Sequence, residues 1–209
     1  MSETAAVAYD AAGRDVVERT WAAVAGPGSF FTGGERLVVA ETARAARSGK
    51  SPARPMSAAM TDATRRVSAE AMSIRPEMIE VWSAGGLDPL AYIELVSVVA
   101  RVVAVDSYLA ALGQPPGPLP AARPGEPDPF VDATAEISTG WVPTVGPAQA
   151  TASLSALPRE AAGAEAVSDA LYLSYAGVSD LRRDPKRPIS RPQMELVASR
   201  VSWLNECFY

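Results

Sequence analysis

The longest apolar run of the chain lies between Asp88 and Gly113, and it restricts the fold more than any other feature. Its many valines are β-branched and would suit a strand. The run is nevertheless far longer than the strands of globular proteins, so its length favours a helix. Asp88 followed by Pro89 is a typical helix start, because proline fits the first turn, where no amide hydrogen bond is needed. The sequence therefore predicts a long helix from Pro89 to about Leu112.

The same run argues against a membrane-spanning segment. Glu94, Arg101 and Asp106 interrupt it, and no stretch of the chain reaches about 18 uncharged apolar residues. The first residues, MSETAAVAYD, lack the basic start and the apolar core of a signal peptide. A single cysteine cannot form an intramolecular disulfide, which is typical of a reducing compartment. We therefore expect a cytoplasmic protein.

Helix starts recur along the rest of the chain. Thr32 precedes Glu35 by three residues, the spacing of a capping box. Ser190 and Gln193 have the same spacing, with Pro192 in the expected first turn. These patterns predict helices that begin after Thr32 and after Ser190.

Two further segments are predicted to be helical. Ser73 is expected to cap a short helix that has Pro76 in its first turn. The segment from residue 157 to residue 181 has helical composition, with expected interruptions at Gly163 and Gly177.

A proline-rich segment divides the chain. It contains prolines at positions 115, 116, 118, 120, 124, 127 and 129, a density that no helix or central strand accommodates. We therefore predict an all-α fold of two related helical units. Residues 1–113 form the first unit, residues 114–150 form the proline-rich connection, and residues 151–209 begin a second, incomplete unit.

The relation between the units comes from a repeated pattern. The segment ELVSVVARVVAVDSY begins at Glu94, and ELVASRVSWLNECFY begins at Glu195. Both begin with Glu-Leu-Val and end in tyrosine, and Asp106 occupies the position of Cys207. This shared spacing indicates an internal duplication, and a chance likeness between two apolar helices is the alternative.

Composition limits the chemistry of the chain. Its 209 residues include no histidine, which excludes a Ser-His-Asp triad, a Cys-His pair and histidine-based metal sites within it. A net charge of -5 argues against a nucleic-acid surface, which requires clustered lysine and arginine. We expect no cofactor and no metal, and chemistry that uses carboxylates or the single thiol.

A glutamate followed twelve positions later by a cysteine, on a helical scaffold, resembles the alkylhydroperoxidase D-like branch of the carboxymuconolactone decarboxylase superfamily. Glu195 and Cys207 match that pattern, which continues in the family as Cys-x-x-Cys-x-x-x-His. The longer members have an N-terminal unit without the cysteine pair, like residues 1–113. The resemblance implies an oligomeric, antioxidant, thiol-dependent peroxidase or disulfide reductase. Its cysteine pair would reduce a hydroperoxide or a disulfide with electrons from a thiol donor, while Glu195 would relay protons.

The second cysteine of the pattern would fall at position 210 and the histidine at position 214, after Tyr209. Three explanations are open: a truncated or decayed gene, a fragment of a longer chain, or a UGA codon that encodes selenocysteine after Tyr209. Glu206 and the terminal carboxylate would disfavour a thiolate at Cys207. We therefore expect little or no peroxidase activity from the 209-residue chain.

The spacing of the two candidate residues predicts a bend in the chain. In one straight helix Glu195 and Cys207 would lie about 18 Å apart along the axis, too far for proton transfer. Asn205 is typical of helix N-caps, and a new helix from there would place Cys207 in its first turn. The helix dipole would then lower the pKa of the thiol.

Each candidate also has an ordinary interpretation. Cys207 can be a small buried apolar residue, and Glu195 can be a carboxylate that favours the positive end of its helix. Glu94 can be a relic of the same proton relay, although the sequence favours an ion pair with Arg101. Two other functions remain open: a carboxymuconolactone decarboxylase-like lyase, which needs no cysteine pair, and a non-catalytic helical oligomerisation module.

Overall fold

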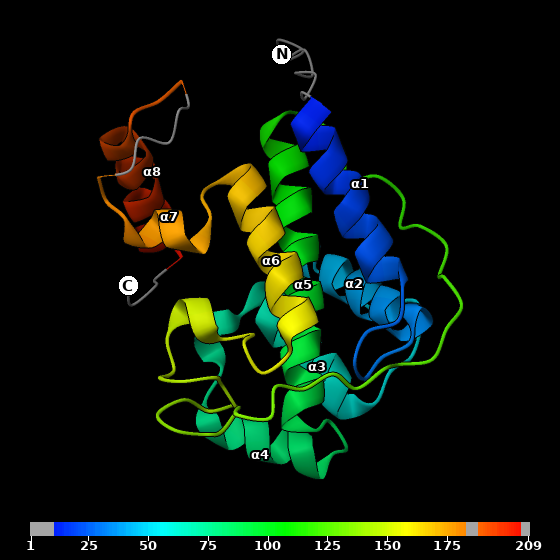
Figure 1. The fold of residues 1–209 in the computed structure, drawn as a ribbon. Helices are drawn as coiled ribbons and strands as arrows, with labels where there is room; N and C mark the ends of the chain where they lie inside the picture. Colours follow the sequence, from blue (N-terminus) through cyan, green and yellow to red (C-terminus); the bar gives the residue numbers. More distant parts are fainter. Residues whose placement is uncertain (1–10, 183–187, 206–209) are drawn as a thin grey trace.

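The computed structural model describes residues 11–182 and 188–205, and this part of the chain is all-α (Figure 1). It contains no strand, and one isolated bridge joins Glu136 and Thr144. Two short 3-10 helices cover Ala71–Ser73 and Ala150–Ala152. The predicted all-α class is confirmed. The α-helices are α1 (Ala11–Ala25), α2 (Gly33–Arg47), α3 (Ala58–Ala69), α4 (Pro76–Ala84), α5 (Pro89–Ala111), α6 (Pro158–Leu171), α7 (Tyr175–Ser179) and α8 (Arg191–Leu204).

The predicted long helix is α5, and it forms the centre of the molecule. It packs against α1, α2, α3 and α6, and Figure 1 shows it in green between α6 and the α1–α2 pair. The Asp88 side chain accepts a hydrogen bond from the Leu90 amide at 2.8 Å, and Pro89 occupies the first turn, as predicted. No helix in the described part of the chain is long and apolar enough to cross a membrane.

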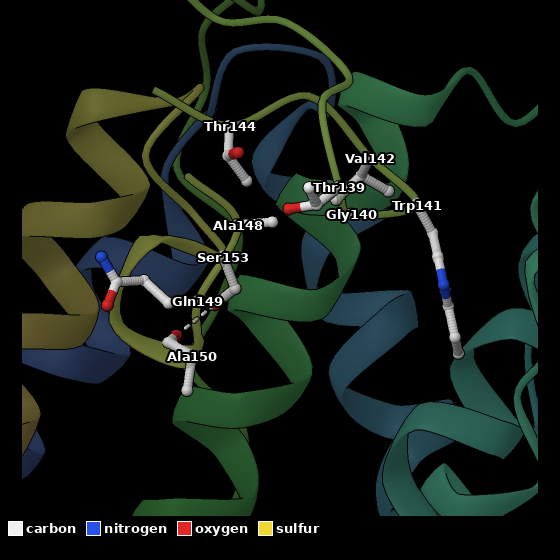
Figure 2. A pocket seen from close by; sticks show the side chains of 9 residues that line it. All are labelled: Thr139, Gly140, Trp141, Val142, Thr144, Ala148, Gln149, Ala150 and Ser153. Carbon is white, nitrogen blue, oxygen red and sulfur yellow. Dashed lines mark hydrogen bonds between the residues drawn. The ribbon is translucent and has the colours of Figure 1, made fainter. Parts of the chain in front are cut away.

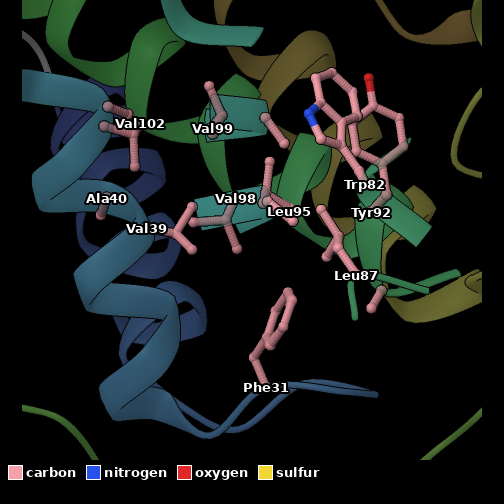
Figure 3. Close-up of a cluster of buried hydrophobic side chains, with 14 of the residues drawn as sticks. Phe31, Val39, Ala40, Trp82, Leu87, Tyr92, Leu95, Val98, Val99 and Val102 are labelled. Atoms are coloured by element: carbon pink, nitrogen blue, oxygen red, sulfur yellow. The ribbon is translucent and has the colours of Figure 1, made fainter. Parts of the chain in front are cut away.

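The core lies along α5, chiefly where α2 faces it. Figure 3 shows Val39 of α2 directed toward Val98 of α5, with Phe31 closing one end of the cluster. Trp82 of α4 stacks against Tyr92 of α5, with ring centroids 5.3 Å apart. Most valines of α5, which would also suit a strand, are buried because other helices cover α5 on several sides.

Both predicted capping boxes are confirmed. The Thr32 amide donates to Glu35 Oε2 at 2.8 Å, and the Glu35 amide donates to Thr32 Oγ1 at 3.3 Å. At the start of α8, the Ser190 amide donates to Gln193 Oε1 at 2.8 Å. These side chains satisfy amide groups that have no partner inside the helix.

The predicted cap at Ser73 is wrong. Ser73 belongs to the 3-10 helix Ala71–Ser73, and α4 begins at Pro76 with Arg75 as its N-cap. A residue that precedes proline is held in an extended conformation, which forces the boundary to Arg75.

The predicted interruption at Gly163 is also wrong. Gly163 lies inside α6, where a Cβ would come within 2.8 Å of Arg101 Nη1. The glycine therefore makes room for a buried arginine rather than ending the helix. Gly177 lies inside α7, and the break between α6 and α7 falls at residues 172–174.

The proline-rich segment has no regular structure up to residue 149, as predicted. It runs from the end of α5 back along the helices (Figure 1). Backbone hydrogen bonds attach it there: the Arg123 amide donates to Ala25 O at 2.8 Å, and the Asp128 amide donates to Gly28 O at 2.9 Å. The segment thereby covers the turn between α1 and α2.

The arrangement of α6 does not confirm a separate second unit. The predicted boundary at residue 151 assigns α6 to that unit, but α6 packs directly against α1 and α5. In Figure 1, α7 and α8 lie to one side, beyond the end of α6.

Candidate functional site

Glu195 lies on α8 and is held by two hydrogen bonds. Arg191 Nε donates to Glu195 Oε1 at 2.5 Å, and the Tyr172 hydroxyl donates to the same oxygen at 3.3 Å. Arg191 and Glu195 are four residues apart and therefore lie on one face of the helix. The Glu195 side chain is 39% exposed, so the carboxylate is oriented by its partners and still reaches solvent.

Arg191 is buried and joins α8 to α7. Its Nη1 donates to Gly177 O at 2.7 Å, and its Nη2 donates to Val178 O at 3.0 Å. These carbonyls belong to the end of the short helix α7, where carbonyl groups lack helical partners and favour a cation. The same guanidinium thus supports the helix junction and fixes Glu195.

Tyr172 completes this cluster as a neutral donor. Burial, followed by the negative charge of Glu195, raises the pKa of Tyr172 above its usual value of 10.0. The phenol is therefore protonated at neutral pH, and its proton is available to the carboxylate.

Cys207, the other predicted site residue, lies outside the described residues. Helix α8 ends at Leu204, and Asn205 is its C-cap, so the helix that carries Glu195 does stop before the cysteine. Glu195 and Leu204 lie nine positions apart on α8, about 13 Å along the axis. The predicted role of Asn205 as the N-cap of another helix concerns residues that are not described.

The repeat-related residues of α5 have a different environment. Glu94 is completely buried, and it accepts a hydrogen bond from Arg36 Nη1 at 2.5 Å and another from the Phe30 amide at 2.6 Å. Asp106, which aligns with Cys207, forms a two-pronged pair with Arg44 at 2.7 and 2.8 Å. Helix α2 therefore supplies an arginine to each of the two carboxylates.

The predicted ion pair between Glu94 and Arg101 is wrong. They lie seven positions apart, about 10 Å along the helix, and each finds a closer partner on another helix. Arg101 instead donates to Glu160 Oε2 of α6. The local spacing suggested a pair within α5, but packing of α2 and α6 provided better partners.

Glu160 connects the buried charges into one network. Its carboxylate accepts hydrogen bonds from Arg36 Nη1 at 2.8 Å, from Ser97 Oγ at 2.7 Å and from Arg101. Together with Glu94, this places two carboxylates and two guanidinium groups between α2, α5 and α6, all buried. The opposite charges balance, as buried charges require.

This network has no room for a substrate. A Cβ at Gly28 would lie 1.9 Å from Glu94 Oε1 and 2.1 Å from Arg36 Nη1, so the backbone closes over the pair. Burial, followed by the charge of Arg36, lowers the pKa of Arg101 to about 9, which still leaves it charged at neutral pH. We therefore interpret the network as a structural link between three helices.

Open cavities lie elsewhere, around Trp141. Figure 2 shows the first, of about 290 Å³, with Trp141 pointing away from the other lining side chains. Trp141 also lines a cavity of about 210 Å³ against α5 and one of about 650 Å³ beside α4. Sequence reasoning missed this region, because the segment that provides Trp141 has no regular pattern.

The Glu195 cluster is thus the part of the described chain that combines a predicted site residue with solvent access. Across residues 11–182 and 188–205, no three carboxylate, cysteine or histidine side chains gather closely enough to hold a metal ion. Comparison of the chain with protein-family models, with curated proteins and with solved structures finds no match.

Proposed function

We propose that this protein is a thiol-dependent peroxidase or disulfide reductase, in which Cys207 attacks the substrate and Glu195 transfers protons. The observation that carries the proposal is that the Glu195 carboxylate is both oriented by hydrogen bonds and exposed to solvent. Arg191 and Tyr172 fix its carboxylate, yet 39% of its side chain reaches solvent. A general acid or base must be both positioned and accessible to the proton that it moves.

The chemistry balances with an external thiol. Glu195 takes the proton of Cys207, and the thiolate attacks one oxygen of the hydroperoxide. The O–O bond breaks, Cys207 becomes a sulfenic acid, and the departing alkoxide takes the proton from Glu195 to form an alcohol. One external thiol then condenses with the sulfenic acid and releases water, and a second thiol reduces the mixed disulfide. In this scheme an external thiol takes the part that a second cysteine would play, because the 209-residue sequence contains one cysteine.

Glu195→Gln should slow the oxidation of Cys207 by about 100-fold, the usual lower limit for general acid–base catalysis. Glutamine keeps the size of the side chain but cannot carry the proton. The measurement is single-turnover oxidation of the thiol by cumene hydroperoxide, followed by trapping of the sulfenic acid. Single turnover is used because we expect little steady-state activity from the 209-residue chain.

Glu165→Gln is the matched control, because Glu165 lies on α6 at a partly exposed position outside the Glu195 cluster. In this control variant, Cys207 should be oxidised at the same rate as in the parent. Equal rates for the parent and Glu195→Gln would refute the proposed role of Glu195.

A second candidate, a helical oligomerisation module, is favoured by the outer face of α8. Leu196 is 73% exposed and Trp203 is 67% exposed, although Leu95, which aligns with Leu196, is fully buried in α5. Val197, Val201 and Leu204 form an adjoining exposed stripe with helical spacing. A second copy of the chain would remove this apolar surface from water.

Replacing both Leu196 and Trp203 with glutamate should convert a homo-oligomer into a monomer, because charged side chains cannot be buried in an apolar contact without partners. Sedimentation velocity at micromolar concentrations measures the change. Val81→Glu, on an exposed position of α4, is the control and should leave the assembly intact. A monomeric parent chain would rule out this contact.

A further inference from the structure

The cavity of about 210 Å³ between α4, α5 and the loop is built mainly from apolar side chains. Ile79 comes from α4, Ile93 and Val96 come from α5, and Val142 comes from the loop. No charged side chain lines it. An ionic ligand would lose its hydration there without gaining a partner, so the lining selects an uncharged molecule.

Tyr92 gives this cavity one polar contact. The residue is only 9% exposed, and among the described residues its hydroxyl has no hydrogen-bond partner. Figure 3 shows the ring against Trp82, with the hydroxyl oxygen directed away from the aliphatic cluster. Ser153, the other hydroxyl in the lining, already donates to Ala150 O at 2.9 Å.

The Tyr92 hydroxyl is a donor over a wide pH range. Burial raises the pKa of Tyr92 to about 12, so the phenol stays protonated at neutral and mildly alkaline pH. Since no side chain or backbone group of the described residues accepts from this hydroxyl, a ligand in the cavity with an acceptor would gain a hydrogen bond there.

We propose that this cavity binds a small uncharged molecule with a fused-ring or similar apolar body and a single hydrogen-bond acceptor, which faces the Tyr92 hydroxyl. Its size follows from the volume. A cavity of about 150 Å³ holds benzene, so a cavity of 210 Å³ admits a somewhat larger body. The adjoining cavity of 650 Å³ shares Ile79 and Trp141 and leaves space for a substituent.

This site is separate from the proposed thiol chemistry. Its residues lie on α4, on the first half of α5 and on the loop, whereas Glu195 lies on α8, which Figure 1 shows well apart from α4. Loss of ligand binding would therefore leave the Glu195 proposal untouched, and the reverse also holds.

The test compares 1-indanone, which has a carbonyl acceptor, with indane, which has nearly the same body and no acceptor. Binding is followed by the shift of the Trp141 indole N–H signal, assigned with Trp141→Phe. Both probes should bind the full chain. Tyr92→Phe should weaken the binding of 1-indanone by about three- to tenfold, the usual effect of one neutral hydrogen bond. The same substitution should change the affinity for indane by less than about twofold.

Tyr175→Phe, on α7, is the matched control and should leave the affinity of both probes unchanged. Three outcomes would overturn the proposal. They are no binding of either probe up to its solubility, binding that leaves the Trp141 indole N–H signal unshifted, and an equal loss of affinity for both probes in Tyr92→Phe.

Discussion

Glu160→Gln should lower the free energy of unfolding by about 3–5 kcal/mol, the usual cost of removing one partner from a buried ion pair. Glutamine preserves the shape of the side chain but not its charge. Arg36 would keep the carboxylate of Glu94, whereas Arg101, which is also buried, would lose the carboxylate that it pairs with. Urea unfolding at pH 7, followed by circular dichroism, measures the loss.

Adding Arg101→Met to Glu160→Gln should restore about 1 kcal/mol or more, because it removes the charge that the first change leaves unpaired. Glu165→Gln, on the same helix and partly exposed, should stay within about 0.5 kcal/mol of the parent. The structural interpretation of the network fails if Glu160→Gln costs less than about 1 kcal/mol, or if the double variant is the less stable of the two.

Gly28→Ala should be nearly as damaging and should lower the free energy of unfolding by about 3 kcal/mol or more. The new Cβ would overlap Glu94 Oε1 at 1.9 Å and Arg36 Nη1 at 2.1 Å. The backbone cannot easily retreat, because the Gly28 amide donates to Phe31 O and its carbonyl accepts from the Asp128 amide. Either the ion pair or both backbone hydrogen bonds must give way.

Gly34→Ala is the matched control for that substitution. Gly34 lies in the first turn of α2, and the nearest atom to its added Cβ is Thr32 Oγ1 at 3.8 Å. Because alanine favours a helix by up to about 1 kcal/mol over glycine, this variant should be as stable as the parent or more stable. If both alanine variants unfold at the parental urea concentration, the backbone at Gly28 does not confine the ion pair.

Much of the helical framework could be predicted because its signals are local. The capping pairs Thr32–Glu35 and Ser190–Gln193 lie three residues apart, and Asp88 caps its helix two residues ahead of the amide that it binds. Such contacts depend on residues within about one helical turn. The errors at Ser73 and Gly163 arose where a following proline or a neighbouring arginine decided the outcome.

The charged network could not be predicted, because its contacts join distant segments. Arg36 lies 58 residues from Glu94 and 124 residues from Glu160. In the sequence Glu160 resembles an ordinary acidic residue in the first turn of a helix, and Arg36 simply follows the capping Glu35. No local pattern marks either residue as buried.

The candidate site was predicted in part. The sequence placed Glu195 on a capped helix, and Arg191, four residues earlier on the same face, was within reach of local reasoning. The contact of Tyr172 with Glu195 could not be predicted locally, because Tyr172 comes from the end of α6 and reaches Glu195 only after the chain turns back. The role of Cys207 stays a prediction.

The sequence by itself determined where most helices begin, that α5 is long, and that the proline-rich segment is irregular, because each depends on neighbours within a few residues. Only the tertiary structure decided which arginine meets Glu94, that α6 joins the first helices, and that Tyr92 faces a cavity. Those outcomes depend on competition between partners brought together by packing, in which a nearby residue such as Arg101 can lose to a distant one.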